Sequence, residues 1–302
     1  MHHVALKDKE VSQNEVAAAE AEGPTVAQPI ESDQMQIDDP FQALPETIGT
    51  PSSPLEQVMG YLINEIFSIH KAHIAKPAEA ETKADVKQSP ENQLSAILLV
   101  MTELLGSYNE SKISMLQPSK KVGKDAVGGN KMRSPVLQIL LNHYVCNIVF
   151  DADVTRSSGD KVTDSQKARM NISNWAGAVI VALCSDASGP GALKNAPSSI
   201  VSIRKTVMDT VAKAIKEVGT ATDPLNLRYG RLWALSELCY RLLTAKSSVQ
   251  PRHHDDSSLH IAKIMLEKGF VPLLTNAMAE VDLTYPQVKN LITAIVQPLE
   301  YL

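Results

Sequence analysis

Aromatic residues and glycine are scarce in this sequence, which holds two Trp, four Phe, seven Tyr and 14 Gly among 302 residues. So few glycines cannot supply the turns of a fold built from many tight hairpins. The apolar residues are mainly Leu, Ile, Val, Ala and Met, and aliphatic side chains of this kind suit helices that pack ridge into groove. The composition therefore predicts an all-α protein, with enough apolar residues for one long core or two short ones.

Cysteine is sparse too: Cys146, Cys184 and Cys239 lie far apart and form no Cys-x-x-Cys pair. Because each lies in an apolar stretch, we expect three reduced, buried thiols, as in proteins of the nucleus or cytosol. No secretory signal is visible, and the longest apolar stretches, such as 176–184, are about half the ~20 residues that a membrane span requires. These absences predict a soluble protein of the nucleus, the cytoplasm or both, with no membrane partner.

Charge is distributed unevenly along the chain. Residues 1–50 contain ten Asp/Glu and two Lys, a net charge of −8, whereas the rest of the chain contains 24 acids and 27 bases. A nearly neutral body lacks the basic face of a dedicated nucleic-acid-binding protein, so we expect no specific nucleic acid as a partner. Residues 1–52 hold too little apolar surface to offset the entropy of ordering and are predicted to be a disordered acidic segment. This segment is either a solvated linker, the simpler interpretation, or an acidic docking tail.

Three Ser-Pro pairs have the features of helix starts. A serine can cap the first turn of a helix, and a proline suits the first helical position. After each pair, apolar residues recur every three or four positions, as far as about Ile69, Gly106 and Phe150 respectively. The three pairs are Ser53-Pro54, Ser89-Pro90 and Ser134-Pro135.

A strongly apolar run, 174–184, follows Ser173. Its β-branched residues would fit a buried strand on propensity alone. However, Trp175, Val179 and Leu183 recur at four-residue steps along one helical face. We therefore predict a helix that begins at Ser173.

Four later segments repeat the helical spacing of apolar residues, at 200–218, 224–243, 259–268 (ended by Gly269) and 286–302. Polar stretches separate the predicted helices and are expected to be flexible inserts. The inserts lie near 75–89, 117–133, 151–172, 185–198 and 245–258.

Seven or eight amphipathic helices in succession, without a convincing strand, predict antiparallel helix pairs stacked over residues 53–302. The sequence has no strict repeat period, so we expect an irregular armadillo- or HEAT-like solenoid, with a globular helix bundle as the alternative. Leu302 directly follows an apolar stripe with no cap or polar tail, which suggests a piece of a longer protein.

Two clusters contain residue types that bind metals. The run 253–256, His-His-Asp-Asp, lies in a predicted loop, where adjacent residues rarely converge on one ion. His70 and His73 lie one turn apart near the end of the first predicted helix, where histidine already interacts favourably with the helix dipole. We interpret the first cluster as a solvated loop and the second as a helix end, and we predict no metal ligand.

Sequence motifs of catalysis are missing. There is no Gly-x-Ser-x-Gly elbow, no Walker loop and no dinucleotide-binding glycine motif after a strand. Residues 123–131 resemble a phosphate loop in composition only, because the strand before it and the helix after it are absent. Burial of the three cysteines would raise their pKa values and make the thiols inert. The sequence thus predicts no catalytic residue and no cofactor.

One predicted helix, 224–243, carries a polar set and an aromatic set of side chains. We interpret the polar set as a solvated face with local ion pairs rather than as a binding patch. The aromatic set holds the suspected anchors for a partner, since aromatic and Arg side chains concentrate binding energy. The polar set is Arg228, Arg231, Arg241 and Glu237, and the aromatic set is Tyr229, Trp233 and Tyr240.

Five groups of strings are more specific than the composition. They are TELLGSYN at 102–109 with SK at 111–112, SNWA at 173–176 with VIV and LC up to 184, RYGRLWAL at 228–235, IAKIM at 261–265, and DLTYP at 282–286 with PLE at 298–300. In this order they resemble a middle stretch of the giant HECT-type E3 ubiquitin-protein ligases of the Mule class, in their fungal form. The resemblance covers roughly 54–302, and its specificity lies in the combination of strings, none of which is a catalytic motif.

The resemblance implies a piece of a very large ring- or solenoid-shaped scaffold of armadillo-like helices that presents protein substrates. In that family a C-terminal HECT domain transfers ubiquitin through a thioester on its own cysteine. That domain is not in this sequence, so no catalytic role carries over to the three cysteines present. The implied partners are protein substrates or adaptor proteins and the rest of the ligase scaffold. The acidic segment also fits the family, whose helical arrays are interrupted by such stretches.

Two other functions remain open. A free-standing helical-repeat adaptor would be monomeric and cooperatively folded, whereas a severed solenoid should self-associate through its exposed apolar end. A small metal- or nucleotide-dependent enzyme has only the weak loop clusters in its favour.

Overall fold

The computed structural model describes residues 53–75, 90–116, 134–149, 164–187, 197–245 and 256–302. Within these ranges the chain forms ten α-helices, one π-helical segment (η1) and no strand, so the all-α prediction is confirmed. None of these helices combines the length and the apolar character that crossing a membrane requires. The elements are α1 (Pro54–Ala75), α2 (Pro90–Ser107), α3 (Asn109–Leu116), α4 (Pro135–Ile139), η1 (Leu140–Val145), α5 (Asp164–Cys184), α6 (Ser198–Thr220), α7 (Leu225–Thr244), α8 (Asp256–Glu267), α9 (Phe270–Ala279) and α10 (Val288–Leu299).

The helices α1, α2 and α4 begin at the prolines of the three Ser-Pro pairs, as predicted. Ser53 Oγ accepts a hydrogen bond from the backbone N of Glu56 at 3.2 Å, which satisfies one free donor of the first turn. The Oγ of Ser134 accepts from the backbone N of Leu137 at 3.5 Å and donates to the carbonyl of Met115 at 3.3 Å. Ser134 therefore caps α4 and also ties it to the end of α3.

Two helix boundaries differ from the prediction. The helix expected to reach about Phe150 widens into η1 and ends at Val145. The helix expected to begin at Ser173 begins at Asp164, so residues 164–172, predicted to belong to an insert, are helical. This first part of α5 is largely solvent-exposed and therefore lacks an apolar stripe. Ser173 itself is buried, and its Oγ donates to the carbonyl of Val145 at 2.9 Å.

The sequence prediction missed two short helices, α3 and α9. Only Tyr108 separates α3 from α2, and α9 follows directly on Gly269, which turns the chain with φ +73°. The last helix begins at Val288 rather than at Pro286, after Gln287 in the left-handed region with φ +65°. The other predicted inserts and the acidic segment 1–52 lie outside the described residues, apart from short flanks at their edges.

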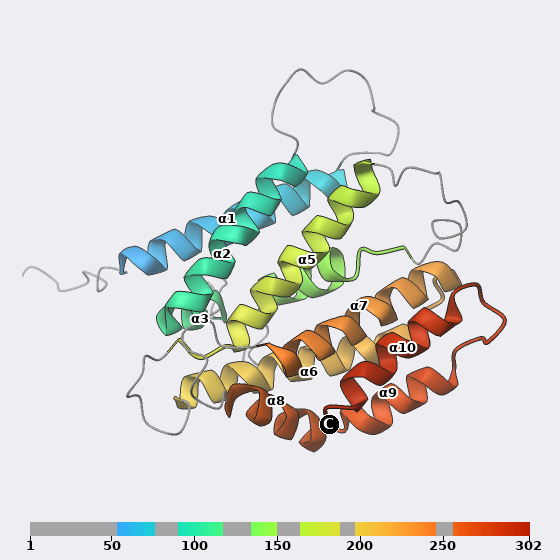
Figure 1. The fold of residues 1–302 in the computed structure, drawn as a ribbon. Helices are drawn as coiled ribbons and strands as arrows, with labels where there is room; N and C mark the ends of the chain where they lie inside the picture. The colour runs from blue at the N-terminus through green and yellow to red at the C-terminus, as the bar shows by residue number, and fades with distance from the viewer. Residues whose placement is uncertain (1–52, 76–89, 117–133, 150–163, 188–196, 246–255) are drawn as a thin grey trace, which may run out of the picture. The chain divides into compact units, whose positions relative to one another are not determined.

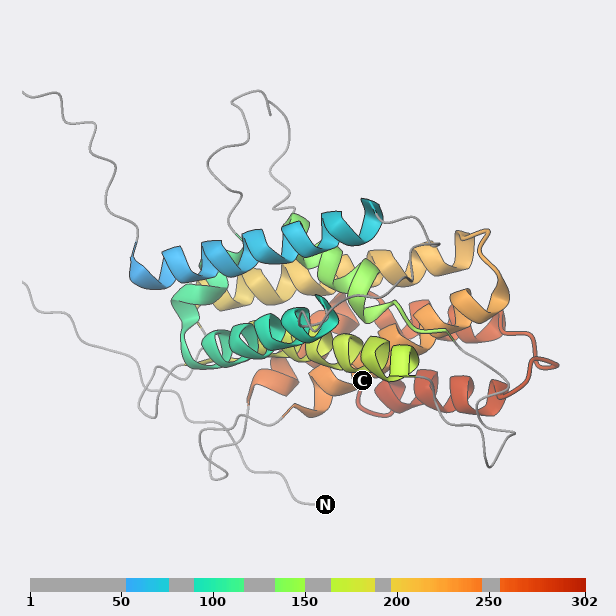
Figure 2. The same ribbon diagram turned by 90° about the horizontal axis from the view of Figure 1, so that it is seen from above.

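The helices pack in a progression along the chain, with the long ones lying alongside one another (Figures 1 and 2). The main contacts join α1 to α2 and α3, α2 to α5, α5 to α6, α6 to α7, and α7 to α10. One continuous core of buried aliphatic residues runs through these interfaces. The first helices, α1 to α4, connect to the last, α8 to α10, mainly through α5, α6 and α7, so the described part is an irregular helical solenoid, as predicted.

Two glycines provide a matched test of this backbone. Gly60 lies inside α1, and a Cβ added there would meet nothing within 4 Å, whereas Gly269 has φ +73°. Gly60→Ala should raise the free energy of unfolding by about 0.5–1 kcal/mol, because alanine reduces the entropy of the unfolded chain. Gly269→Ala should lower it by about 1–2 kcal/mol, because a Cβ is disfavoured in that conformation. Denaturant titrations of both variants that gave changes of equal sign would contradict this assignment.

Candidate functional site

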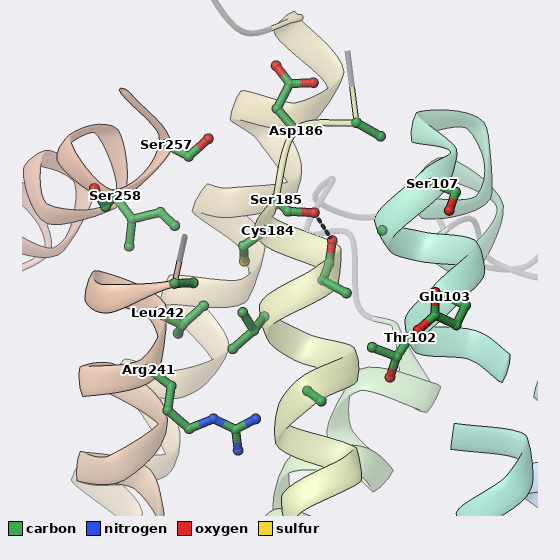
Figure 3. A pocket seen from close by; sticks show the side chains of 17 residues that line it. Thr102, Glu103, Ser107, Cys184, Ser185, Asp186, Arg241, Leu242, Ser257 and Ser258 are labelled. Carbon is green, nitrogen blue, oxygen red and sulfur yellow. Dashed lines mark hydrogen bonds between the residues drawn. The ribbon is translucent and has the colours of Figure 1, made fainter. Parts of the chain in front are cut away.

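A groove of about 400 Å³ lies at the C-terminal end of α5, with walls from α2, α5, α7 and α8 (Figure 3). Segments far apart in the sequence meet here, because α5 packs on both α2 and α7. The residues labelled in Figure 3 are Thr102, Glu103 and Ser107 of α2, Cys184, Ser185 and Asp186 at the end of α5, Arg241 and Leu242 of α7, and Ser257 and Ser258 of α8.

Arg204 of α6 is the main link behind this groove, with only 1% of its surface exposed. Its Nε donates to the carbonyl of Cys184 at 2.8 Å, and its Nη2 donates to Ser257 Oγ at 2.8 Å. Its Nη1 lies 2.8 Å from Nδ1 of His260, which must accept because a guanidinium only donates. Burial and the positive charge of Arg204 lower the pKa of His260, in agreement with a neutral, accepting ring. One guanidinium thus joins α5, α6 and α8.

Lys112 of α3 approaches the same helix end and is fully buried. Its Nζ donates to the carbonyl of Ser185 at 2.6 Å and to Asn109 Oδ1 at 3.1 Å. Burial lowers the pKa of Lys112 to about 8, and the nearby carboxylate of Asp186 partly opposes this shift. Asn109 Nδ2 in turn donates to Asp186 Oδ1 at 3.0 Å. The amine therefore holds α3 against the segment that follows α5.

Both buried cations bind carbonyls at a helix C-terminus, where the partial negative charge of the helix dipole stabilises them. Their hydrogen-bonding capacity is directed at backbone and side-chain groups of the protein itself. Arg241, on the opposite wall, lies over Gly177, where a Cβ would come within 2.6 Å of its Nη1. Both terminal nitrogens of Arg241 lie 3.4 Å from the carbonyl of Asn174. Arg204, Lys112 and Arg241 thus bond to backbone of other helices around the groove, and this arrangement is that of a structural joint.

All three cysteines are buried, as predicted. Burial raises the pKa values of Cys146, Cys184 and Cys239 to about 12 each. A thiol with such a pKa is almost wholly protonated at neutral pH and is a poor nucleophile. The expectation of buried thiols is therefore confirmed, and their raised pKa values favour low reactivity.

Of the candidate metal-binding residues, His70 and His73 lie in the described part of the chain. The His70 ring lies 4.5 Å from that of His143 and 5.9 Å from that of Tyr144, measured between centroids. Burial, His143 and His73 together lower the pKa of His70. No group of three side chains able to hold a metal occurs within the described ranges. Residues 253–255 of the His/Asp run, like the glycine-rich stretch 123–131, lie outside them.

Of the suspected aromatic anchors on α7, Tyr229 is not available to a partner, because it is buried. Its hydroxyl accepts from the backbone N of Asp282 at 2.8 Å, and its ring packs edge-on to Tyr285 at 4.8 Å. Tyr229 therefore belongs to the core, and its suspected role as an anchor was wrong. Trp233 packs half-buried against that core, and the ring of the half-buried Tyr240 lies edge-on to a neighbouring tyrosine.

The polar set on α7 forms local bonds. Arg231 pairs with Asp223 at 2.7 Å, and both side chains are partly exposed. Arg228 Nε donates to the carbonyl of Val218 at 3.2 Å, at the end of α6. The interpretation of this face as one of local ion pairs is confirmed for Arg231, whereas Arg228 bonds to backbone.

Arg204 and Lys112 were missed in the sequence, although a signal for each was present. Arg204 lies next to Ile203 and one turn before Val207, within the apolar stripe of its helix. Lys112 similarly precedes Met115 by three positions in a helix too short to show its period. A charged residue within a buried stripe indicates a buried hydrogen-bonding group.

The fold and this joint define an all-α helical solenoid in which buried polar groups fix helices to one another. The chain is similar to three curated fungal proteins. E3 ubiquitin-protein ligase ptr1 of Schizosaccharomyces pombe is 29% identical over 214 residues, which are 68% of this chain and 6% of that protein. E3 ubiquitin-protein ligase TOM1-like of Neurospora crassa is 29% identical over 206 residues, which are 63% of this chain and 5% of that protein.

The third relative, probable E3 ubiquitin-protein ligase TOM1 of Eremothecium gossypii, is 25% identical over 273 residues, or 83% of this chain and 8% of that protein. The resemblance to fungal E3 ubiquitin-protein ligases is thereby confirmed, and the chain spans less than a tenth of the length of these relatives. No protein-family model matches the chain. No solved structure matches it either.

Lys112 gives the stability a pH dependence of defined sign. Its pKa is about 8 in the folded chain, against an ordinary value of 10.5 that applies when the chain is unfolded. Between these values the unfolded state binds the proton and the folded state does not, so the free energy of unfolding rises with pH. The wild type should gain up to about 3 kcal/mol relative to Lys112→Met from pH 8 to pH 10.5 in paired denaturant titrations. Parallel pH profiles of the two chains would refute this.

The burial of the thiols predicts slow alkylation. A pKa of about 12 in place of 9 leaves roughly a thousandfold less thiolate, and burial blocks the reagent further. Iodoacetamide at pH 8 should therefore leave the folded chain unmodified while all three thiols react in guanidinium, as followed by intact mass. Rapid labelling of even one thiol in the folded chain would argue against it.

Proposed function

We propose that this chain is a non-catalytic part of the helical scaffold of a HECT-type E3 ubiquitin ligase, where it presents protein substrates. The observation that carries the proposal is the similarity of 63–83% of the chain to three fungal E3 ubiquitin-protein ligases, of which it spans only 5–8%. A segment so small in proportion contributes one part of a larger protein. The proposed partners are protein substrates, adaptor proteins and the rest of the ligase, in the nucleus, the cytoplasm or both.

The chemistry of the described residues supports a scaffold role. Ubiquitin transfer of the HECT type passes through a thioester and therefore requires a reactive thiolate. The three thiols of this chain are buried with raised pKa values, and its buried cations bind helix ends. A solenoid built in this way offers extended surfaces on a fixed frame, which suits the holding of substrates.

A free-standing helical-repeat adaptor is the second candidate. The observation in its favour is that residues 50–302 form one compact unit with its own continuous core. Such a chain would hold two proteins together without any link to ubiquitin transfer.

The length of the native polypeptide distinguishes between these two functions. An antibody raised against residues 200–300 should detect a band of several hundred kilodaltons if the chain is part of a giant ligase. A band near the 32.8 kDa of this sequence would favour the adaptor. In the large protein, deletion of residues 54–302 should preserve the ubiquitin thioester while lowering the yield of substrate conjugates. Loss of the thioester itself would contradict a purely scaffolding role, and unchanged conjugates would exclude substrate presentation.

A further inference from the structure

The buried guanidinium of Arg204 makes one hydrogen bond whose acceptor can be lost by protonation. Its Nη1 lies 2.8 Å from Nδ1 of His260, and its Nη2 donates to Ser257 Oγ at 2.8 Å. Ser257 accepts through a hydroxyl oxygen, which does not titrate near neutral pH. His260 accepts through a ring nitrogen only while that nitrogen carries no proton, since both nitrogens of a protonated imidazole are donors. This bond between α6 and α8 therefore depends on the neutral form of His260.

The surroundings of His260 oppose its protonation. Burial of the ring lowers its pKa most, and the positive charges of Arg204, Lys205 and Lys263 lower it further. Glu267, on α8, raises the pKa and has the smallest of these effects. Among the described residues, α7 and α9, which also pack on α8, add no charged group to this set. A proton on Nδ1 would place two positive charges at hydrogen-bonding distance in a half-buried site, where water screens them poorly.

The end of α8 has anchors of its own. Ile264 and Met265 are buried in the core, and Lys268, just after α8, pairs with Asp209 of α6 at 2.6 Å. These contacts do not involve His260, so we expect them to persist when its ring is protonated. The helix can then move at its start while its end stays in place.

We propose that protonation of His260 in mildly acidic solution breaks its hydrogen bond with Arg204 and releases the first turns of α8 from the end of α5. The two cations repel each other. Because Ser257 lies three positions before His260 on the same helix face, movement of the ring also carries Ser257 away from the guanidinium. The Arg204–His260 pair is thus a pH-sensitive latch between α6 and α8. The latch belongs to the joint and not to ubiquitin transfer, so it holds or fails independently of the proposed function.

Opening of the latch changes the groove at the end of α5. Ser257 and Ser258 of α8 form part of its wall, opposite Glu103 of α2 (Figure 3). Displacement of the start of α8 widens this groove of about 400 Å³, while Arg204 keeps its bond to the carbonyl of Cys184. The latch therefore couples the acidity of the solution to the width of the groove.

Amide hydrogen exchange of the 302-residue chain tests the latch, with rates corrected for the intrinsic effect of pH on exchange. Amides 260–264 of the wild type should lose about tenfold in protection from about pH 7.5 to about pH 5, because the released ring binds a proton more readily than the latched ring. His260→Asn should keep its protection, because its amide oxygen accepts from Arg204 at either pH. His73→Asn, a matched change at an exposed histidine of α1, should behave as the wild type. The amides of α10 provide the internal reference and should keep their protection in all three chains.

Several outcomes would overturn the inference. Unchanged protection of α8 in the wild type would show that the latch does not open, and an equal loss in His260→Asn would assign the effect to other groups. An equal loss in α10 would mean that acid weakens the whole fold rather than the start of α8. A nitrogen NMR titration of the wild-type histidines, which requires no variant to fold, should show a neutral His260 ring protonated on Nε2, with a pKa below the ordinary 6.5. A neutral ring protonated on Nδ1, or a pKa at or above 6.5, would exclude the latch.

Discussion

The hydrogen bond from Arg204 to the carbonyl of Cys184 is the constraint on which the arrangement of the later helices depends. A buried guanidinium is tolerable only when its donors are satisfied, and these donors find partners on both α5 and α8. One side chain of α6 therefore ties α8 to the end of α5. Lys112 of α3 makes a similar bond, to the carbonyl of Ser185. Together the two cations offset the partial negative charge at the C-terminal end of α5.

The groove at the end of α5 and a second groove, between α1 and α2, differ in how their polar groups are bonded. At the end of α5 the cations Arg204 and Lys112 are buried and bond within the protein. Between α1 and α2, Glu65 accepts a hydrogen bond from Gln93 beside the exposed side chain of Tyr61.

The sequence predicted the long helices well, because their apolar stripes extend over several turns. It missed α3 and α9, since eight to ten residues are too few to reveal a 3.6-residue period. It also placed the start of α5 too late, because its first turns are polar and exposed. The role of Arg204 depends on a carbonyl twenty residues away, which no local pattern encodes. Tyr229 looked like a surface anchor for the same reason, because only the tertiary fold brings Tyr285 and Asp282 against it.

The stacking of the helices in layers has a mechanical consequence. The first and last helices share no substantial contact, so a tension applied along the stack is passed on through α5, α6 and α7. Such an array is compliant: it can bend or open between two layers while the others remain intact. Small changes in the angle at each interface add up along the stack and so change its curvature.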